Sequence, residues 1–410
     1  MTVEPIIIDT DPGVDDVLAI IFLLLSNEVH VKAITLTHGN TDLYNIKRNA
    51  VTLLHVMQKH RESVNSTISF QDLPVLAVGS ELPLKSDSIY ATYFHGSDGL
   101  GEIYKQGKYT APPDWENQII HQAAQEEALY DNDDPCQHKP FKTTGRDGAD
   151  EILYQLKQAP PLTVSILAVG PLTNVALAYQ RDPVTLSRVK RIVIMGGAVD
   201  SPGNVTSMAE FNFRADPDAA DIVLSTSKGF QATPKGYRDR VSLVTEGKKA
   251  PIHVTILPLK AADNGDISVQ DFEKYVKPLD TPLAVFCNSF LEHTFGVIAK
   301  FYNADTLPVY DAYAGFLLLD MIPDKGDGST TPDFDNNWKC QYIDLHVETS
   351  EQNTLGMSYY DKRPETKKLL NGCPGSTPNN VQVITEGNGS RFRHLFMSRV
   401  FGVDINVDQQ

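Results

Sequence analysis

The sequence predicts an α/β fold, a single large domain with a mostly parallel central sheet flanked by helices. Continuously apolar segments of strand length alternate with segments of helical periodicity along much of the chain. Such strands are typical of parallel sheets that helices cover on both faces. The chain has 410 residues, enough for one large core. We therefore expect residues 1–410 to form one domain with a Rossmann-like core.

The expected elements begin with a strand over residues 5–9, "PIIID", followed by a helix from about Asp15. The other predicted strands cover residues 31–39, 73–79, 162–170, 191–197 and 252–259, and the other helices cover residues 45–57, 171–179 and 216–226. The pair Asp216-Pro217 supports the last helix, because aspartate is a favoured N-cap and proline suits the first helical position.

Three segments interrupt this alternation. Residues 103–145 are rich in polar residues, proline and glycine, which predicts a surface insertion that forms part of a lid. Residues 227–251 indicate a second insertion, a connector that contains Gly and Lys. The stretch "PDKGDGSTTPDFDNN" from Pro323 predicts a loop, and residues 340–348 predict a strand that returns the chain to the domain.

Composition and charge narrow the class of partner. The chain has 36 Lys and Arg against 52 Asp and Glu, a net charge of −16, which argues against nucleic acid and against an anionic membrane. The apolar run 17–25 is too short to span a bilayer. No secretory signal is visible, and the cysteines are too scattered for a disulfide framework or a zinc site, so we expect a cytoplasmic protein. These cysteines are Cys136, Cys287, Cys340 and Cys373.

Four aspartates, Asp9, Asp11, Asp15 and Asp16, lie within eight residues of one another after the first strand. Their mutual repulsion predicts a bound cation, and Ca²⁺ and Mg²⁺ prefer oxygen ligands of this kind. The spacing does not fit an EF-hand, whose sixth position needs glycine. Helix capping explains Asp15 or Asp16 but not Asp9 and Asp11. An Asp-x-Asp pair after a strand also occurs in haloacid-dehalogenase-type phosphotransferases, although Pro12-Gly13 does not suit that motif.

Polar motifs follow several other predicted strands. "THGN", "AVGPLTN" and "MGGAVDSPGN" each come directly after an apolar segment. In a parallel sheet the carboxyl ends of neighbouring strands meet at one edge, where ligands bind. We therefore expect these motifs and the aspartates to form one site.

At this point the motifs resemble those of a known family. "DTDPGVDDVLAI" is similar to the D-x-D-P-G-x-D-D signature of the inosine/uridine-preferring nucleoside hydrolases. "THGN", "FHGSDGLG", "AVGPLTNVALA", "MGGAVDSPGN", "AEFN" and "YDAYA" follow in the order of that family. The resemblance covers most of the chain apart from the insertions. It implies a calcium-dependent enzyme that hydrolyses the N-glycosidic bond of ribonucleosides, usually as a homodimer or homotetramer.

The resemblance also implies roles for individual residues. Asp11 is expected to act as the general base, Asp15 to bind the ribose 2′-hydroxyl, and Asn40 to order the aspartates, with Asp9 supporting the cluster from behind. The calcium ligands would be Asp11, Asp16, the backbone carbonyl of Val169 and Asp311, and the remaining ribose contacts Asn204, Glu210, Asn212 and Asp311. Glu210 and Asn212 are two residues apart, so on an extended segment they would face the same side.

The leaving base is the part of the reaction that the sequence defines least. Many family members have a histidine just before the last calcium ligand, where this chain has Tyr310. Tyr310 and His95 are the candidate groups for steering or protonating the base. Trp115 and Trp338 are more typical of core or loop packing. The departure at Tyr310 keeps open a non-catalytic nucleoside- or ribose-binding protein of the same fold, and the phosphotransferase remains a third alternative.

Overall fold

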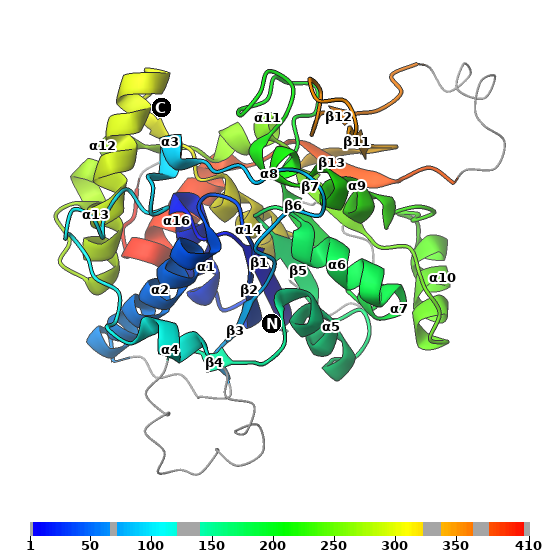
Figure 1. Cartoon of the computed structure of the whole chain (residues 1–410), viewed down its shortest axis with the longest axis horizontal. Helices are drawn as coiled ribbons and strands as arrows, with labels where there is room; N and C mark the ends of the chain where they lie inside the picture. Colours follow the sequence, from blue (N-terminus) through cyan, green and yellow to red (C-terminus); the bar gives the residue numbers. More distant parts are fainter. Residues whose placement is uncertain (1–2, 66–71, 121–139, 323–337, 364–376, 406–410) are drawn as a thin grey trace, which may run out of the picture.

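The computed structural model describes residues 3–65, 72–120, 140–322, 338–363 and 377–405. A nine-stranded sheet runs through its centre in the order β10-β13-β7-β6-β5-β1-β2-β3-β4 (Figure 1). Every neighbouring pair is parallel except β10 with β13. The predicted fold, one domain around a mostly parallel sheet, is confirmed. The loop predicted over residues 323–337 lies outside the described residues.

The strands have the following bounds: β1 (Glu4–Thr10), β2 (Val29–Leu36), β3 (Val75–Val78), β4 (Lys142–Thr143), β5 (Ser165–Ala168), β6 (Ile192–Met195), β7 (Val254–Leu257), β10 (Lys339–Ile343) and β13 (Val381–Glu386). Strand order reverses at β1, since β2 and β3 follow on one side and β5 to β7 on the other. In sheets of this type the crevice beyond the strand ends at such a reversal is the usual ligand site.

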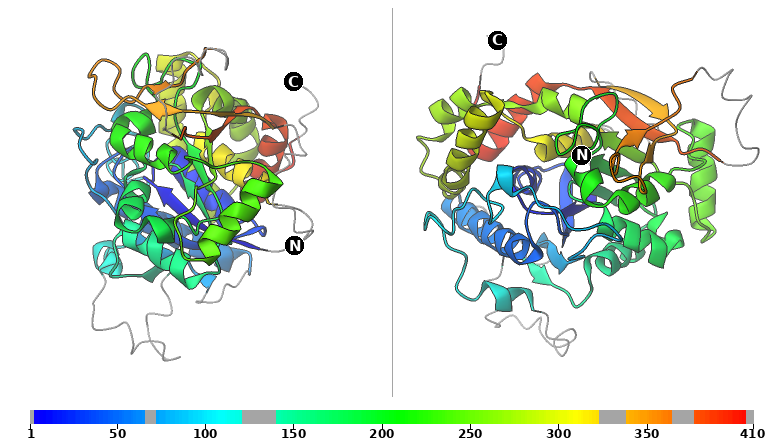
Figure 2. Two further views of the ribbon diagram at one scale, coloured as in Figure 1. Left: turned by 90° about the vertical axis from the view of Figure 1, so that its right-hand side faces the viewer. Right: turned by 45° about the horizontal axis from the view of Figure 1, so that its top comes forward.

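Helices cover both faces of the sheet (Figures 1 and 2). One face has α1 (Val14–Leu24), α2 (Leu43–Ser63), α13 (Pro282–Val297), α14 (Tyr310–Asp320) and α16 (Gly389–Phe401). The other has α5 (Gly148–Gln158), α6 (Thr173–Arg181), α7 (Pro183–Leu186) and α9 (Pro217–Ser225). Each face has its own cluster of buried apolar side chains. This explains why the strands are apolar on both sides.

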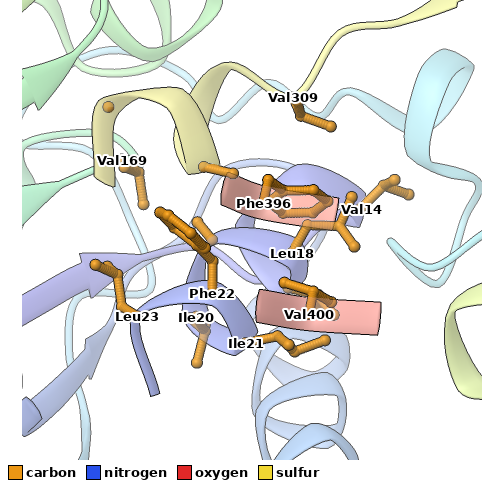
Figure 3. Packing of buried hydrophobic residues seen from close by; sticks show 14 of the residues in the cluster. Val14, Leu18, Ile20, Ile21, Phe22, Leu23, Val169, Val309, Phe396 and Val400 are labelled. Atoms are coloured by element: carbon orange, nitrogen blue, oxygen red, sulfur yellow. The ribbon is translucent and has the colours of Figure 1, made fainter. Parts of the chain in front are cut away.

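Helix α1 is buried almost all round because its sequence, "VDDVLAIIFLL", has apolar residues on every side after the two aspartates. Figure 3 shows Leu18, Ile21 and Phe22 of α1 beside Phe396 and Val400 of α16. The rings of Phe22 and Phe396 have centroids 5.8 Å apart. Burying one such side chain contributes about 1.5–3 kcal/mol. The packing fixes the helix, and with it the two aspartates in its first turn.

The N-cap predicted at Asp216 is confirmed. Its Oδ1 accepts a hydrogen bond from the amide of Ala219 (3.1 Å), and Pro217 stands at the start of α9. Its Oδ2 accepts from Thr173 Oγ1 (2.7 Å) and from the amide of Leu84 (2.9 Å). The same carboxylate therefore joins α6, α9 and the loop that follows β3.

The described part of the 103–145 segment packs against α2 and the sheet edge. Within it, α4 (Trp115–Ile119) contacts α2 through the rings of Trp115 and Tyr44, whose centroids are 5.1 Å apart. Its strand β4 pairs with β3. Residues 121–139 lie outside the described residues. The 227–251 segment, expected to be a connector, contains a helix, α10 (Pro234–Thr245), which Thr233 caps.

Smaller elements surround the strand ends. They are α3 (Thr92–His95), α8 (Phe211–Ala215), α11 (Leu259–Ala262), α12 (Val269–Asp271), the short helices η4 (Asp263–Gly265), η5 (Phe272–Val276) and η6 (Ile298–Tyr302), and the strands β8 (Ile267–Ser268), β9 (Thr306–Leu307), β11 (His346–Val347) and β12 (Ser358–Tyr359). Among the described helices, none has the length and apolar character needed to cross a membrane. Within the described residues, Cys287 and Cys340 are unpaired thiols.

Candidate active site

A cavity of about 240 Å³ opens beyond the carboxyl ends of the central strands. Most of the residues predicted for the site line it, namely Asp15, Asn40, His95, Val169, Asn204, Glu210, Asn212, Tyr310 and Asp311. The two remaining residues, Asp11 and Asp16, are fully buried just behind the lining. Segments separated by as much as 300 residues of sequence thus meet at one edge of the sheet, as the motif positions predict.

Asp16 organises the turn between β1 and α1. Its carboxylate accepts hydrogen bonds from Thr10 Oγ1 (2.6 Å), the amide of Gly13 (3.0 Å) and Asn40 Nδ2 (2.7 Å). The amide of Asp11 adds a fourth, longer bond (3.2 Å). The turn and the neighbouring "THGN" loop are therefore held by one side chain.

Asp11 is bonded on one side only. Its Oδ2 accepts from the amide of Asn40 at 2.6 Å. Its Oδ1 is shielded from solvent and has no hydrogen-bond partner among the described residues. Glycines surround it closely, since a Cβ at Gly39 would lie 2.0 Å from Oδ2 and one at Gly170 would lie 2.5 Å from Oδ1. A buried carboxylate oxygen in this state is costly unless a cation or proton compensates it.

Asp15, Asp16 and Asp311 bring carboxylate oxygens within 4.8 Å of one another. Burial and the charge of Asp16 raise the pKa of Asp15 to about 8. Burial and the neighbouring carboxylates raise the pKa of Asp11 and of Asp311 well above the usual range. We call Asp11, Asp15, Asp16 and Asp311 the carboxylate end of the cavity. Its ligands are all oxygens, which suits a hard divalent cation.

Glu210 and Asn212 line the cavity from a helix start, and the prediction of an extended segment is wrong. Glu210 is the N-cap of α8, and its carboxylate accepts from the amides of Gly197 (2.9 Å), Asn212 (2.8 Å) and Phe213 (3.1 Å). An extended N-cap followed by a helical turn brings both side chains to the cavity in a different way. The alternation of apolar and polar residues in "AEFNF" is typical of a strand and does not indicate a helix N-cap.

The carbonyl of Val169, an expected metal ligand, lies at the end of β5 and accepts a hydrogen bond from Asn212 Nδ2 (2.9 Å). A carbonyl oxygen has two lone pairs, so one remains for a further partner. Asn204 Oδ1 accepts from the amide of Phe211 (2.9 Å). This bond fixes the loop after β6 against the start of α8 and leaves the Asn204 amide group at the cavity wall.

Another part of the cavity wall is aromatic. Tyr93, Phe94, Tyr302 and Tyr310 line it together with Asp266 and Thr306, and we call these six residues the aromatic end. The rings of Phe94 and Tyr302 meet edge to face, with centroids 6.2 Å apart. Such a surface fits a flat ring better than a charged group.

The two expected leaving-group residues have defined hydrogen bonds. His95 Nδ1 accepts from the amide of Val14 (3.1 Å), so its proton is on Nε2, and burial lowers its pKa to about 3. Tyr310 donates its hydroxyl proton to Asp263 Oδ1 (2.9 Å), and burial raises its pKa far above the ordinary phenol value. His95 is therefore neutral, and the Tyr310 proton is directed at Asp263.

Comparison with known proteins identifies the family. The sequence profile described as "Inosine-uridine preferring nucleoside hydrolase" matches residues 6–394. The chain belongs to the inosine-uridine preferring nucleoside hydrolase family. It is 35% identical over 224 residues to Uridine nucleosidase 1 of Arabidopsis thaliana, a match that spans 54% of each chain. It is 31% identical over 289 residues to the pyrimidine-specific ribonucleoside hydrolase RihA of Salmonella arizonae, covering 70% of this chain and 72% of that one.

Solved structures of nucleoside hydrolases share the fold. A plant nucleoside hydrolase, the PpNRh1 enzyme, superposes with a TM-score of 0.71 at 21% identity and covers 98% of this chain and all of that one, 100%. An inosine-guanosine nucleoside hydrolase gives a TM-score of 0.68 at 22% identity, covering 97% of this chain and 99% of that one. At these identities the likeness concerns the fold.

Some features of this nucleoside hydrolase fold were not predicted from sequence. Tyr93, Phe94, Tyr302, Asp266 and Thr306 line the cavity without having been singled out. A signal was available for Phe94, which directly precedes His95 in "FHGSDGLG". The others lie in or beside short elements, α3, η6, β8 and β9, and belong to none of the motifs identified above. No residue of the described part of 103–145 lines the cavity.

Asp9 and the two tryptophans lie away from the cavity lining. Asp9 is fully buried, and its Oδ1 accepts from Thr35 Oγ1 (2.5 Å) and Asn174 Nδ2 (2.8 Å). It thereby joins β1 to β2 and α6 behind the turn, and a phosphoryl donor has no access to it. Trp115 packs on α2, and Trp338 donates to Asp320 Oδ2 (2.9 Å).

Proposed function

We propose that this protein hydrolyses the N-glycosidic bond of ribonucleosides in a calcium-dependent reaction that releases a free base and ribose. The observation that supports it most is the cavity itself. The cavity combines four clustered carboxylates, three of them buried, with a wall of aromatic rings. A nucleoside has matching polarity, because it joins a hydroxyl-rich sugar to a flat base.

Asp11, Asp16, Asp311 and the carbonyl of Val169 would hold the calcium ion. Two findings fit this assignment: the buried Asp11 Oδ1 that lacks a partner within the described residues, and an all-oxygen ligand set with raised pKa values. When bound, the ion supplies Lewis acidity, making a water molecule more acidic and fixing the ribose hydroxyls.

The remaining residues of the carboxylate end act on the water and the sugar. Asp11 takes a proton from the attacking water, and Asp15 accepts the hydrogen bond of the 2′-hydroxyl. Asn40 keeps both Asp11 and Asp16 in place through the hydrogen bonds described above. The other ribose contacts are assigned to Asn204, Glu210, Asn212 and Asp311. Negative oxygens around the sugar also favour the oxocarbenium-like transition state, because its positive charge is absent from the ground state.

The aromatic end is assigned to the base. Tyr93, Phe94 and Tyr302 would enclose the flat ring, and Tyr310 forms a wall next to Asp311. His95 can donate from Nε2 as a neutral imidazole, since Nδ1 is occupied by the amide of Val14. Its low pKa makes it a hydrogen-bond donor to the substrate and not a cationic acid.

The direct test is to incubate the purified protein with uridine, inosine, adenosine and cytidine and to measure free base and reducing sugar. Uridine is the first choice because relatives are named as uridine nucleosidases. We expect turnover that exhaustive chelation abolishes and calcium restores. Binding of a nucleoside without any release of base would instead support the non-catalytic alternative. Full activity after chelation would contradict the assigned mechanism.

We also propose that the protein forms a homodimer or homotetramer and acts in the cytoplasm. The oligomeric state is proposed from the resemblance to the family, whose members are usually homodimers or homotetramers. Analytical ultracentrifugation and cell fractionation test the two proposals, and a monomer at micromolar concentration would contradict the first.

A further inference from the structure

Part of the aromatic end is a small two-stranded sheet whose strands, β8 and β9, are far apart in the sequence. Strand β8 pairs antiparallel with β9, so that Ile267 lies opposite Leu307 and Ser268 opposite Thr306. Asp266 precedes β8, Thr306 opens β9, and both line the cavity. Strand β9 ends three residues before Tyr310 and four before Asp311, at the start of α14. The two-stranded sheet is therefore close along the chain to the carboxylate end.

Only one carboxylate oxygen of Asp266 has a hydrogen-bond partner among the described residues. Its Oδ2 accepts a hydrogen bond from Thr306 Oγ1 at 2.9 Å. Its Oδ1 is shielded from solvent and has no partner in the part of the chain that the structure describes. Burial raises the pKa of Asp266 to about 6, and the charge of Asp263 adds to the increase, while the Thr306 bond and Arg393 oppose it. The protonated acid is thus accessible close to neutral pH.

Expulsion of the base requires such a group. The nitrogen of the breaking bond gains negative charge, which an ionised carboxylate would repel and a protonated one would neutralise. His95 is a poor source of this proton because burial lowers its pKa to about 3. Tyr310 donates to Asp263, and burial raises the pKa of Tyr93 to about 12. Burial raises the pKa of Glu210, but both of its carboxylate oxygens already accept backbone hydrogen bonds, which oppose protonation.

We propose that Asp266, oriented by Thr306, is the acid that protonates the departing nucleobase, an inference that rests on the proposed nucleoside hydrolysis. As the bond between C1′ and the base nitrogen breaks, its electron pair goes to the base, and the Asp266 proton passes to a base nitrogen or carbonyl oxygen. The attacking water bonds to C1′ and gives a proton to Asp11. Asp11 then releases its proton to solvent and Asp266 takes one up from solvent, so charge and atoms balance over one turnover.

The charged groups around Asp266 set the pH at which it acts. Asp263 of η4 and Arg393 of α16 act on it directly, and Tyr310 of α14 interacts with both Asp266 and Asp15. Because the acid must carry its proton, the rate on nucleosides should fall as pH rises through about 6. Asp305 provides a matched control, since it precedes Thr306, is exposed and does not line the cavity.

The experiment compares Asp266→Asn, Asp305→Asn and the unchanged protein on uridine and on p-nitrophenyl riboside. The second substrate leaves as a stable anion and needs no proton. We expect Asp266→Asn to slow uridine hydrolysis about 10²-fold and to change p-nitrophenyl riboside hydrolysis less than about threefold, with Asp305→Asn unaffected on both. Retained turnover of the second substrate also shows that the variant is folded.

The pH dependence provides an independent readout. In the unchanged protein, the ratio of uridine to p-nitrophenyl riboside rates should fall about tenfold between roughly pH 5 and 7, because ionisations common to both substrates cancel. In Asp266→Asn this ratio should be flat. Thr306→Val removes a bond that favours the carboxylate and should move the fall to higher pH.

Equal slowing of both substrates would overturn the proposal, because Asp266 would then only shape the cavity. The proposal would also be overturned if Asp266→Asn kept the uridine rate of the unchanged protein. The same holds if the ratio of uridine to p-nitrophenyl riboside rates still fell with pH in Asp266→Asn. If the unchanged protein cleaves neither p-nitrophenyl riboside nor any nucleoside, the proposed function itself fails. This outcome differs from those that would overturn only the role of Asp266.

Discussion

The two ends of the cavity are built in different ways. The carboxylate end consists of Asp11, Asp15 and Asp16, which follow the central strand β1, and of Asp311 in the first turn of α14. Four hydrogen bonds are on Asp16 alone. The aromatic end is built from short helices, loops and the two-residue strands β8 and β9. Its polar groups include Asp266 Oδ1, which has no partner among the described residues. The end of a central strand therefore positions three of the four carboxylates, whereas short elements and connecting segments position the residues of the aromatic end.

This difference separates two properties of the enzyme that we propose. Chemistry on the sugar is common to all ribonucleosides and should depend on the rigid end. Choice of base and its departure should depend on the loop-built end, since loops vary without disturbing a sheet. Substitutions at the two ends should therefore affect different kinetic parameters.

The largest effect should come from the carboxylate end. Asp11→Ala removes the proposed general base and a proposed metal ligand together, so turnover should fall about 10⁴-fold on every nucleoside. Metal content measured by atomic emission should fall with it, as it should in Asp16→Ala. A stoichiometric calcium content with normal turnover in Asp11→Ala would show that this end has been assigned wrongly.

The sugar itself provides the next test. A site built to bond a hydroxyl retains unpaired polar groups when that hydroxyl is missing. We expect 2′-deoxyuridine to be hydrolysed about 10³-fold more slowly than uridine, measured as kcat/KM, because Asp15, Asn204, Glu210 and Asn212 surround the ribose position. Equal rates on the two substrates would refute the ribose contacts while leaving the metal assignment intact.

A single methyl group should also disturb the carboxylate end. A Cβ at Gly39 would lie 2.0 Å from Asp11 Oδ2, so Gly39→Ala must displace the carboxylate. A displacement of about 1 Å in a catalytic group costs roughly 10²-fold in rate. Gly296→Ala is the control, because a Cβ there meets nothing within 4 Å. If Gly39→Ala keeps its rate, the rigidity claimed for this end is absent.

Sequence reasoning succeeded where a strand end determines the position of a residue. The motifs that carry Asp11, Asn40, Val169 and Asn204 follow β1, β2, β5 and β6, and a parallel sheet must bring such positions to one edge. It failed on backbone detail, since Glu210 caps a helix that the pattern did not reveal. It also missed α10, where Gly236 and many polar residues weaken the helical pattern.

The aromatic end could not have been predicted in the same way. Asp266 and Thr306 are 40 residues apart in the sequence. They meet where β8 and β9 pair, over two residues of each strand. Strands that short leave no periodic signal. Nor does the sequence show that the Tyr310 hydroxyl is bonded to Asp263, a contact that depends on how η4 packs against α14.

The smallest effect should come from Tyr310, which stands where the family resemblance leads us to expect a histidine. Its hydroxyl already donates to Asp263, so Tyr310→Phe removes one neutral donor from the aromatic end and leaves the ring in place. A hydrogen bond of this type contributes about 0.5–1.5 kcal/mol, which predicts a loss of about threefold to tenfold on uridine and almost none on p-nitrophenyl riboside. A loss on uridine as large as that of Asp266→Asn would make Tyr310 the proton donor after all. Equal slowing of both substrates would mean that Tyr310 only shapes the wall. No slowing on either would confine its role to holding Asp263, and the contrast between a fixed sugar site and an adaptable base site would then rest on Asp266 and Thr306.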